Sequence, residues 1–136
     1  MPKAPVPAHI AEFLAKPNPA VIASNRPDGQ PVSVATWYVW DSDRILVNMS
    51  DQRKRLAYLR KDPRVSLTIF QNDNWGSHVS VQGAITEWHD DADLADIDRL
   101  AIHYSGNPYP DRAGRRVSAW IEIDRWHGWG GFSPDA

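Results

Sequence analysis

A cluster of cations at the start of a short helix is the feature of this sequence best suited to chemistry. Arg53, Lys54 and Arg55 follow Ser50 and Asp51, whose side-chain oxygens can cap a helix. The free N–H groups at a helix start already carry partial positive charge, so cations there are disfavoured unless an anion binds. Arginines at such an end are suited to clamping a phosphate. A solvated basic face without a ligand is the alternative, and charge alone does not decide between the two.

The positive charge is confined to this stretch. Residues 51–64 hold six basic and two acidic side chains, a net charge of +4, whereas the whole chain carries −2. The rest of the chain is therefore acidic, which argues against a nucleic-acid partner, because such proteins need a basic domain. The same acidity disfavours a single-strand binder that would use the basic helix together with aromatic side chains.

Other routes to catalysis are missing from the sequence. The chain has no cysteine, which excludes thiol catalysis, and its five histidines lack zinc-type spacing, so no metal is expected. Neither a nucleophile elbow nor a glycine-rich phosphate loop occurs between a strand and a helix. What remains is an anion clamp and aromatic surface, with seven tryptophans. Such a protein can act by holding a cofactor that carries its own chemistry.

Length and composition fit one soluble domain over residues 1–136, with 42% hydrophobic and 24% charged residues. The N-terminus leads into no apolar signal segment, and no apolar run approaches the length that spans a membrane. We therefore expect a cytoplasmic protein with no membrane partner.

Hydrophobic periodicity predicts about six antiparallel strands and three short helices. The strands are expected over residues 20–24, 31–40, 44–49, 64–70, 77–88 and 116–124, and the helices over 7–16, 51–62 and 91–104. The first three strands are expected to form a meander, with a turn at 41–43. Alternation along 31–40 places Trp37 on the face opposite Val34 and Tyr38, and Gly83 in mid-strand predicts a bulge or a close backbone approach. The pattern indicates a mainly β fold, an antiparallel barrel with helices packed outside.

A family resemblance rests on the segment Arg53-x-Arg55-x-x-x-Leu59-x-x-Asp62-Pro63-Arg64-Val65. It resembles the signature of the pyridoxamine 5'-phosphate oxidase-like split β-barrel flavoproteins, and is most similar to the branch that uses the deazaflavin coenzyme F420. Residues 28–31 resemble the family's first hairpin, 79–84 its central strand, and 115–117 the entry to its last strand. The match covers most of the chain in the family's order.

The resemblance implies a homodimer of split β-barrels with two cofactors at the subunit interface. It implies that Arg53 and Arg55 grip the cofactor phosphate, with Lys54 between them assisting or pointing to solvent. The phosphate end would be lined by Met49, Ser50 and Gln52, and the ring system by Val34, Ala35, Thr36 and Trp37. The partner subunit would contribute Trp75, with the aromatic tail at 126–129 as a further candidate. Two departures from the family are Arg55, often lysine in relatives, and the bulky Trp37 beside the ring.

The function expected from the resemblance is an oxidoreductase in which reduced F420 passes a hydride to an unsaturated or conjugated small molecule. The sequence leaves two alternatives open: an FMN-dependent reductase or oxidase of the same fold, and a non-catalytic carrier of flavin, deazaflavin or haem. No residue stands out as a catalytic proton donor, and the sequence does not identify the substrate.

Overall fold

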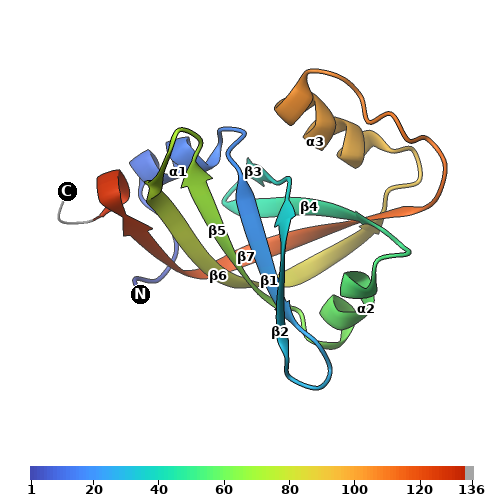
Figure 1. The fold of residues 1–136 in the computed structure, drawn as a ribbon, viewed down its shortest axis with the longest axis horizontal. Helices are drawn as coiled ribbons and strands as arrows, with labels where there is room; N and C mark the ends of the chain where they lie inside the picture. The colour runs from blue at the N-terminus through green and yellow to red at the C-terminus, as the bar shows by residue number, and fades with distance from the viewer. Residues whose placement is uncertain (134–136) are drawn as a thin grey trace.

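Seven strands form one antiparallel sheet in the order β2-β1-β5-β6-β7-β4-β3, with three α-helices packed around it (Figure 1). The structure is a computed structural model that describes residues 1–133. The strands are β1 (Ala20–Asn25), β2 (Pro31–Thr36), β3 (Val39–Asp41), β4 (Arg44–Ser50), β5 (Arg64–Gln71), β6 (Asn74–Asp90) and β7 (Arg116–Trp129). The helices are α1 (Ala8–Leu14), α2 (Lys54–Lys61) and α3 (Ala95–Ser105), and a 3-10 turn at Gly130–Phe132 follows β7.

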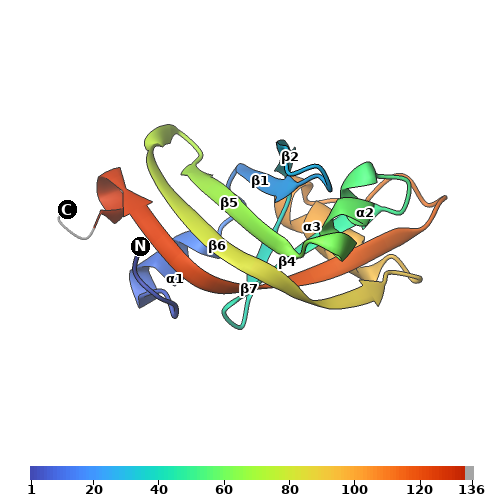
Figure 2. The same cartoon turned by 90° about the horizontal axis from the view of Figure 1, so that it is seen from below.

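The sheet curves on itself without closing. The long strands β6 and β7 run side by side along the molecule and bend with it (Figure 2). The two edge strands, β2 and β3, do not pair with each other within residues 1–133. A strongly curved antiparallel sheet with such a gap is a split barrel, so the predicted mainly β fold with flanking helices is confirmed.

The strand predicted over residues 31–40 is broken in two, which makes seven strands where about six were expected. β2 ends at Thr36 and β3 begins at Val39, with Trp37 and Tyr38 as the link. The two halves have different neighbours, because β2 pairs with β1 whereas β3 pairs with β4. These pairs lie at opposite ends of the sheet order, so the predicted meander of the first three strands is wrong.

The core fills the inside of the curved sheet. Its fully buried members include Ile10 and Leu14 of α1, Leu59 of α2, and Ile22, Leu67, Ile69, Val79, Val81 and Ile121 of the sheet. In α1 and α2 the buried residues recur at helical spacing, so each helix packs one apolar stripe against the sheet. A second, smaller cluster holds α3 against β3 and β4, and consists of Val39, Leu46, Ile97 and Leu100.

A strand irregularity and a turn follow the predicted backbone chemistry. The β6–β7 register shifts between Gln82 and Gly83, and a Cβ atom on Gly83 would lie 2.0 Å from the carbonyl oxygen of Glu122. Only glycine fits this close approach, as predicted. The β3–β4 hairpin turns through Ser42 and Asp43, whose φ angles of 53° and 62° suit a two-residue turn that matches the strand twist.

Candidate functional site

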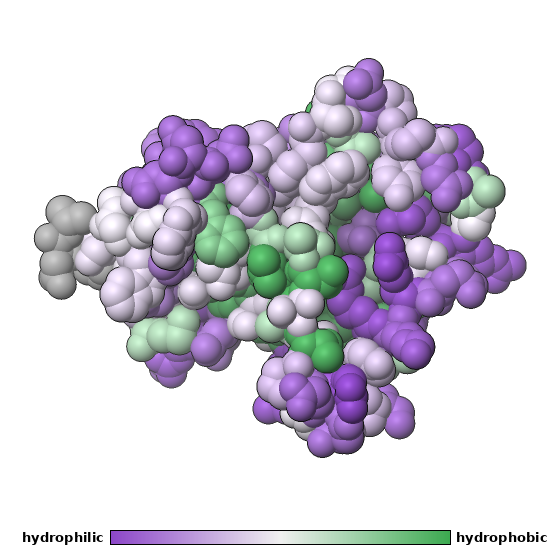
Figure 3. Space-filling view, in the orientation of Figure 1, coloured by the Kyte–Doolittle hydropathy of each residue, from purple (hydrophilic) through white to green (hydrophobic). Residues whose placement is uncertain are grey.

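A cleft of about 850 Å³ opens where the sheet fails to close. Its walls come from β1 and β2 on one side, from the end of β4 and the start of β7 on another, and from α3 with the loop that follows it. The start of α2 supplies the basic end. Figure 3 shows an apolar area at the centre of this face, bordered by strongly hydrophilic surface on the side of α2.

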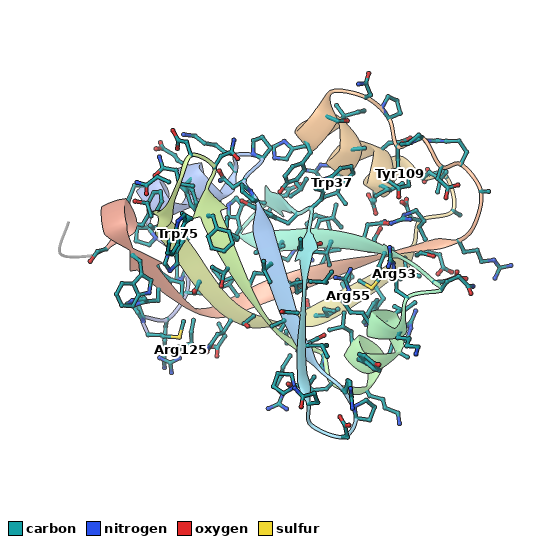
Figure 4. The ribbon with its side chains drawn as sticks, viewed as in Figure 1. Trp37, Arg53, Arg55, Trp75, Tyr109 and Arg125 are labelled. Carbon is teal, nitrogen blue, oxygen red and sulfur yellow. The ribbon has the colours of Figure 1, made fainter. Side chains whose placement is uncertain are left out.

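Nine of the eleven residues that the family resemblance implied line this cleft. They are Val34, Ala35, Thr36, Trp37, Met49, Ser50, Arg53, Lys54 and Arg55. Gln52 is exposed and does not line the cleft, and its Nε2 donates to Asp51 Oδ1 at 3.1 Å. Trp75 is 77% exposed and lies at the end of the sheet far from Arg53 and Arg55 (Figure 4). Within one chain, Trp75 is therefore not near the nine predicted residues that line the cleft.

Helix α2 begins later than the sequence suggested. Arg53 is its N-cap residue and makes no side-chain capping bond, so the prediction that Ser50 or Asp51 caps the helix is wrong. Asp51 N donates to the carbonyl oxygen of Arg115 at 3.0 Å, which keeps the chain paired with the start of β7 at this point. The backbone must leave the sheet before it can form the helix. Ser50 Oγ instead accepts from the backbone N–H of Gln52 at 3.2 Å.

The basic end of the cleft has no internal counter-charge. Within residues 1–133, Arg53, Lys54 and Arg55 form no ion pair, and the buried Nε of Arg55 has no hydrogen-bond partner. Burial, and then the charge of Arg53, lowers the pKa of the Arg55 guanidinium. An unpaired buried donor costs roughly 1–3 kcal/mol, which an incoming acceptor group removes. A phosphate fits this donor set in charge and in hydrogen bonding.

An aromatic wall lies beside the basic end. Trp37 is 36% exposed and stacks on Tyr104, with 5.5 Å between ring centroids and 10° between planes. The rings of Trp37 and Tyr109 are nearly perpendicular, with 6.2 Å between their centroids. Figure 4 shows Trp37 and Tyr109 together below α3. Tyr104 Oη donates to the carbonyl oxygen of Asn18 at 2.7 Å, and burial raises the pKa of Tyr104 to about 12. Tyr104 is therefore a neutral support for Trp37.

The cleft residues outside the predicted cofactor-binding set include three that contact one another, Asn48, Tyr109 and Arg116. The Nε of Arg116 donates to Asn48 Oδ1 at 2.7 Å, and its guanidinium carbon lies 4.8 Å from the centroid of the Tyr109 ring. Two signals were present in the sequence. Asn48 is polar within an apolar strand, and Arg116 belongs to the segment that resembled the family before its last strand.

The aromatic tail is mostly part of the sheet. Strand β7 continues to Trp129, five residues beyond the predicted end at Asp124, because it stays paired with β6 as far as His78. Trp126 is 6% exposed and packs in the core of its own chain. Of the two tryptophans in this candidate segment, Trp126 is therefore buried within its own chain, whereas Trp129 is 54% exposed.

Residues 1–133 contain no group of three or more His, Cys, Asp or Glu side chains arranged to hold a metal ion. In the same part of the chain, none of the helices has both the length and the apolar character needed to cross a membrane. The cytoplasmic location stays a prediction.

The chain belongs to the pyridoxamine 5'-phosphate oxidase family, whose sequence model matches residues 6–130. Among solved structures it is similar to an F420 reductase, with 25% identity, a TM-score of 0.80, and coverage of 89% of this chain and 98% of that chain. A conserved hypothetical protein from Mycobacterium tuberculosis is 27% identical, with a TM-score of 0.73 and coverage of 93% and 86%.

General stress protein 26 from Bacillus anthracis shares the fold, with 17% identity, a TM-score of 0.62 and coverage of 89% and 94%. No curated protein matches the chain. At the level of the family, the matches indicate an oxidoreductase of the flavin or deazaflavin type.

Proposed function

We propose that this protein is an F420-dependent oxidoreductase that reduces an unsaturated or conjugated small molecule. The observation that carries the proposal is the buried, unpartnered Nε of Arg55 at the basic end of an aromatic-walled cleft. Similarity to an F420 reductase over 89% of the chain favours the deazaflavin over FMN. When bound, reduced F420 supplies a hydride from carbon C5 of its ring.

The residues of the cleft divide into two roles in this proposal. Arg53 and Arg55 bind the phosphate, and Lys54 adds charge at the same end. The ring lies along β2, which is an edge strand with β1 as its one neighbour in residues 1–133. The backbone N–H and C=O groups on the free side of such a strand are open to a ligand. Val34, Ala35 and Thr36 therefore offer backbone contacts as well as side chains.

The proposal includes a homodimer with the cofactor at its interface. The cleft of one chain is open to solvent, and Val34 and Trp37 at its wall are 47% and 36% exposed. A second copy that covers this opening would exclude water from the reacting atoms, which strengthens the electrostatic interactions inside. Trp75 of the second copy is the side chain that we propose for this cover.

Titration of the purified protein with F420 and with FMN, followed by fluorescence, tests the proposal. We expect tighter binding of F420. Arg55→Met should weaken F420 binding by about ten- to a hundredfold, because a charge-assisted hydrogen bond is lost. Lys61→Met is the matched control, since Lys61 is an exposed cation of the same helix outside the cleft. It should leave the affinity unchanged.

Each other result has a definite meaning. Equal F420 affinity of Arg55→Met and the wild type would eliminate the phosphate clamp. Tighter binding of FMN would favour the FMN-dependent alternative. Tight F420 binding, with no oxidation of the reduced cofactor by any conjugated acceptor, would favour the non-catalytic carrier.

A further inference from the structure

Arg116 is a further cation of the cleft, beyond the three at the start of α2, and the phosphate clamp does not account for it. It is the first residue of β7 and pairs across the sheet with Ser50, the last residue of β4. Its side chain is half-buried and lines the cleft. No carboxylate in residues 1–133 forms an ion pair with it, whereas Arg99 and Arg112 nearby are paired with Asp41 and Asp98.

Two contacts fix the direction of the Arg116 side chain. Its Nε donates to Asn48 Oδ1, and its guanidinium lies over the ring of Tyr109. Asn48 precedes Ser50 by two residues and so lies on the same face of β4. The bond to Asn48 therefore turns the guanidinium away from the start of α2 and toward the aromatic wall below α3.

The amide of Asn48 is itself fixed by buried partners. Asn48 is 8% exposed, and its Nδ2 donates to Asp91 Oδ2 at 3.1 Å and to Ser118 Oγ at 3.0 Å. Because Nδ2 serves these two acceptors, Oδ1 is left to face Arg116. Asp91 forms no ion pair with Arg116 in residues 1–133, and its oxygens accept from Asn48 and from the backbone N–H groups of Asp96 and Ile97.

The terminal nitrogens of Arg116 have no hydrogen-bond partner in the described part of the chain, since its one side-chain bond uses Nε. A guanidinium that is held on one side and free on the other presents a fork that matches a carboxylate. The guanidinium covers one face of the Tyr109 ring, and Trp37, which is 36% exposed, adjoins Tyr109 on the same wall. The ligand that fits these features has a carboxylate at one end and a conjugated body that lies against the exposed part of Trp37.

We infer that Arg116 is a substrate-binding residue that selects acceptors carrying a carboxylate conjugated to the bond that is reduced. This inference rests on the proposed function, because it names the acceptor class for the same cleft. Arg116 binds the carboxylate, Asn48 and Tyr109 position Arg116, and Trp37 supports the planar body of the acceptor.

The test uses the F420-loaded protein and two probes of equal shape, trans-cinnamate and its neutral amide, cinnamamide. Calorimetric titration should show cinnamate binding about tenfold more tightly than cinnamamide, as expected for one charge-assisted bond in an open cleft. Arg116→Gln should abolish this preference, and Arg116→Lys should keep part of it. Arg115→Gln, which removes an exposed cation one residue away, should keep all of it.

Three outcomes would overturn the inference. The wild type could show no preference for cinnamate, or Arg116→Gln could retain the preference. Arg116→Gln could also weaken F420 binding as strongly as Arg55→Met, which would assign Arg116 to the cofactor. Thermal unfolding of each variant checks that it is folded, with Arg116→Lys as the milder change. Failure of the wild type to bind F420 would instead refute the proposed function.

Discussion

Arg55 and Arg116 are held in opposite ways within one cleft. The Nε of Arg55 is buried without a partner in residues 1–133, so its charge is poorly compensated until a ligand arrives. Arg116 has its Nε bonded to Asn48 and its guanidinium stacked on Tyr109. The first arrangement stores unfavourable energy that an anion relieves, and the second limits the directions in which the side chain can bind.

The buried, unpaired Nε of Arg55 leads to a prediction about the stability of the protein without cofactor. Arg55→Met should leave the unfolding free energy of the apo protein unchanged or raise it by up to about 1 kcal/mol, because it removes a cation from a helix start. Urea unfolding measures this. Lys61→Met removes a cation from the helix end where the dipole favours it, and should lower stability slightly. A loss above roughly 1 kcal/mol in Arg55→Met would show that the arginine supports the fold.

Trp37 should affect the acceptor more than the cofactor phosphate. Trp37→Ala removes one side of the stack with Tyr104, and we expect a stability loss of about 1–3 kcal/mol. Acceptor preference should change, with F420 affinity kept to within about threefold because the arginine clamp is intact. Rates with a panel of conjugated acceptors and F420 titration measure the two effects. Loss of folding in Trp37→Ala would identify Trp37 as a core residue. Trp37→Phe, which keeps an aromatic ring, then tests whether acceptor preference changes in a folded variant.

The start of α3 is joined to the sheet by a buried polar network. Asp91, at 4% exposure, accepts from Asn48 of β4 and from two backbone N–H groups of α3, while Ser118 Oγ of β7 donates to Asp96 Oδ2 at 2.6 Å. Asp91 was predicted to open this helix, and it caps the first turn from outside the helical residues. The network therefore places α3, and with it the aromatic wall, relative to β4 and β7.

A matched pair of variants tests this network. Asp91→Ala should cost about 2–4 kcal/mol, because the helix loses a cap and the buried amide of Asn48 loses an acceptor. Asp93→Ala removes one exposed bond, from the backbone N–H of Ala95, and should cost about 0.5–1 kcal/mol. Urea unfolding of both variants gives the comparison. Equal losses would mean that Asp91 acts as an ordinary cap without a role in the network.

The junction between α2 and β5 should be sensitive to acid. Asp62 accepts two bonds from the guanidinium of Arg64, at 2.9 and 2.7 Å, and one from its backbone N–H, at 3.2 Å. These bonds hold the pKa of the Asp62 carboxyl well below its usual range. A lowered folded-state pKa contributes stability that is present above the unfolded-state value of about 3.9 and is lost as pH falls toward the folded-state value.

Asp62→Asn should therefore be less stable than the wild type near pH 6, and the difference should shrink as the pH falls below about 4. Urea unfolding of both proteins across this range measures the effect. A difference that is constant with pH would show that the charge of Asp62 is not what stabilises the junction.

For the whole molecule, the open side of the sheet is the dominant feature. The cleft lies at the gap, β2 is an edge strand, and Trp75 is exposed at the opposite end of the sheet. Exposed large apolar side chains are typical of interaction surfaces when they gather on one face. A second copy that brings its Trp75 to the cleft would add one of the two implied residues that the cleft of a single chain lacks.

We expect a homodimer whose formation and F420 binding depend on each other. Sedimentation velocity at micromolar concentration should show a dimer, and F420 should stabilise it against dilution by mass action. Trp75→Ser should weaken F420 binding and dimerisation together, whereas Ile102→Ser removes an exposed apolar side chain of α3 that does not line the cleft and should change neither. A stable monomer with full F420 affinity would contradict the proposed interface.

Features that depend on neighbouring residues can be predicted from the sequence. The stripe of Leu56 and Leu59, the end of α2 before Pro63 and the glycine required at position 83 follow from helix period, proline sterics and strand chemistry. The family signature added the split barrel and nine of the residues that line the cleft. Each of these signals occupies a short segment, so it can be found without knowing which strands pair.

Features that depend on contacts between distant segments could be found only in the folded structure. The break at Trp37 and Tyr38 arises because β2 and β3 pair with different strands, and the uniform alternation of residues 31–40 carries no trace of that choice. Arg116 meets Asn48 across 68 residues of sequence, and Trp126 is buried by strands that precede it. A local sequence pattern indicates which side chains need burial or a hydrogen-bond partner. The packing of the sheet determines which residues provide it.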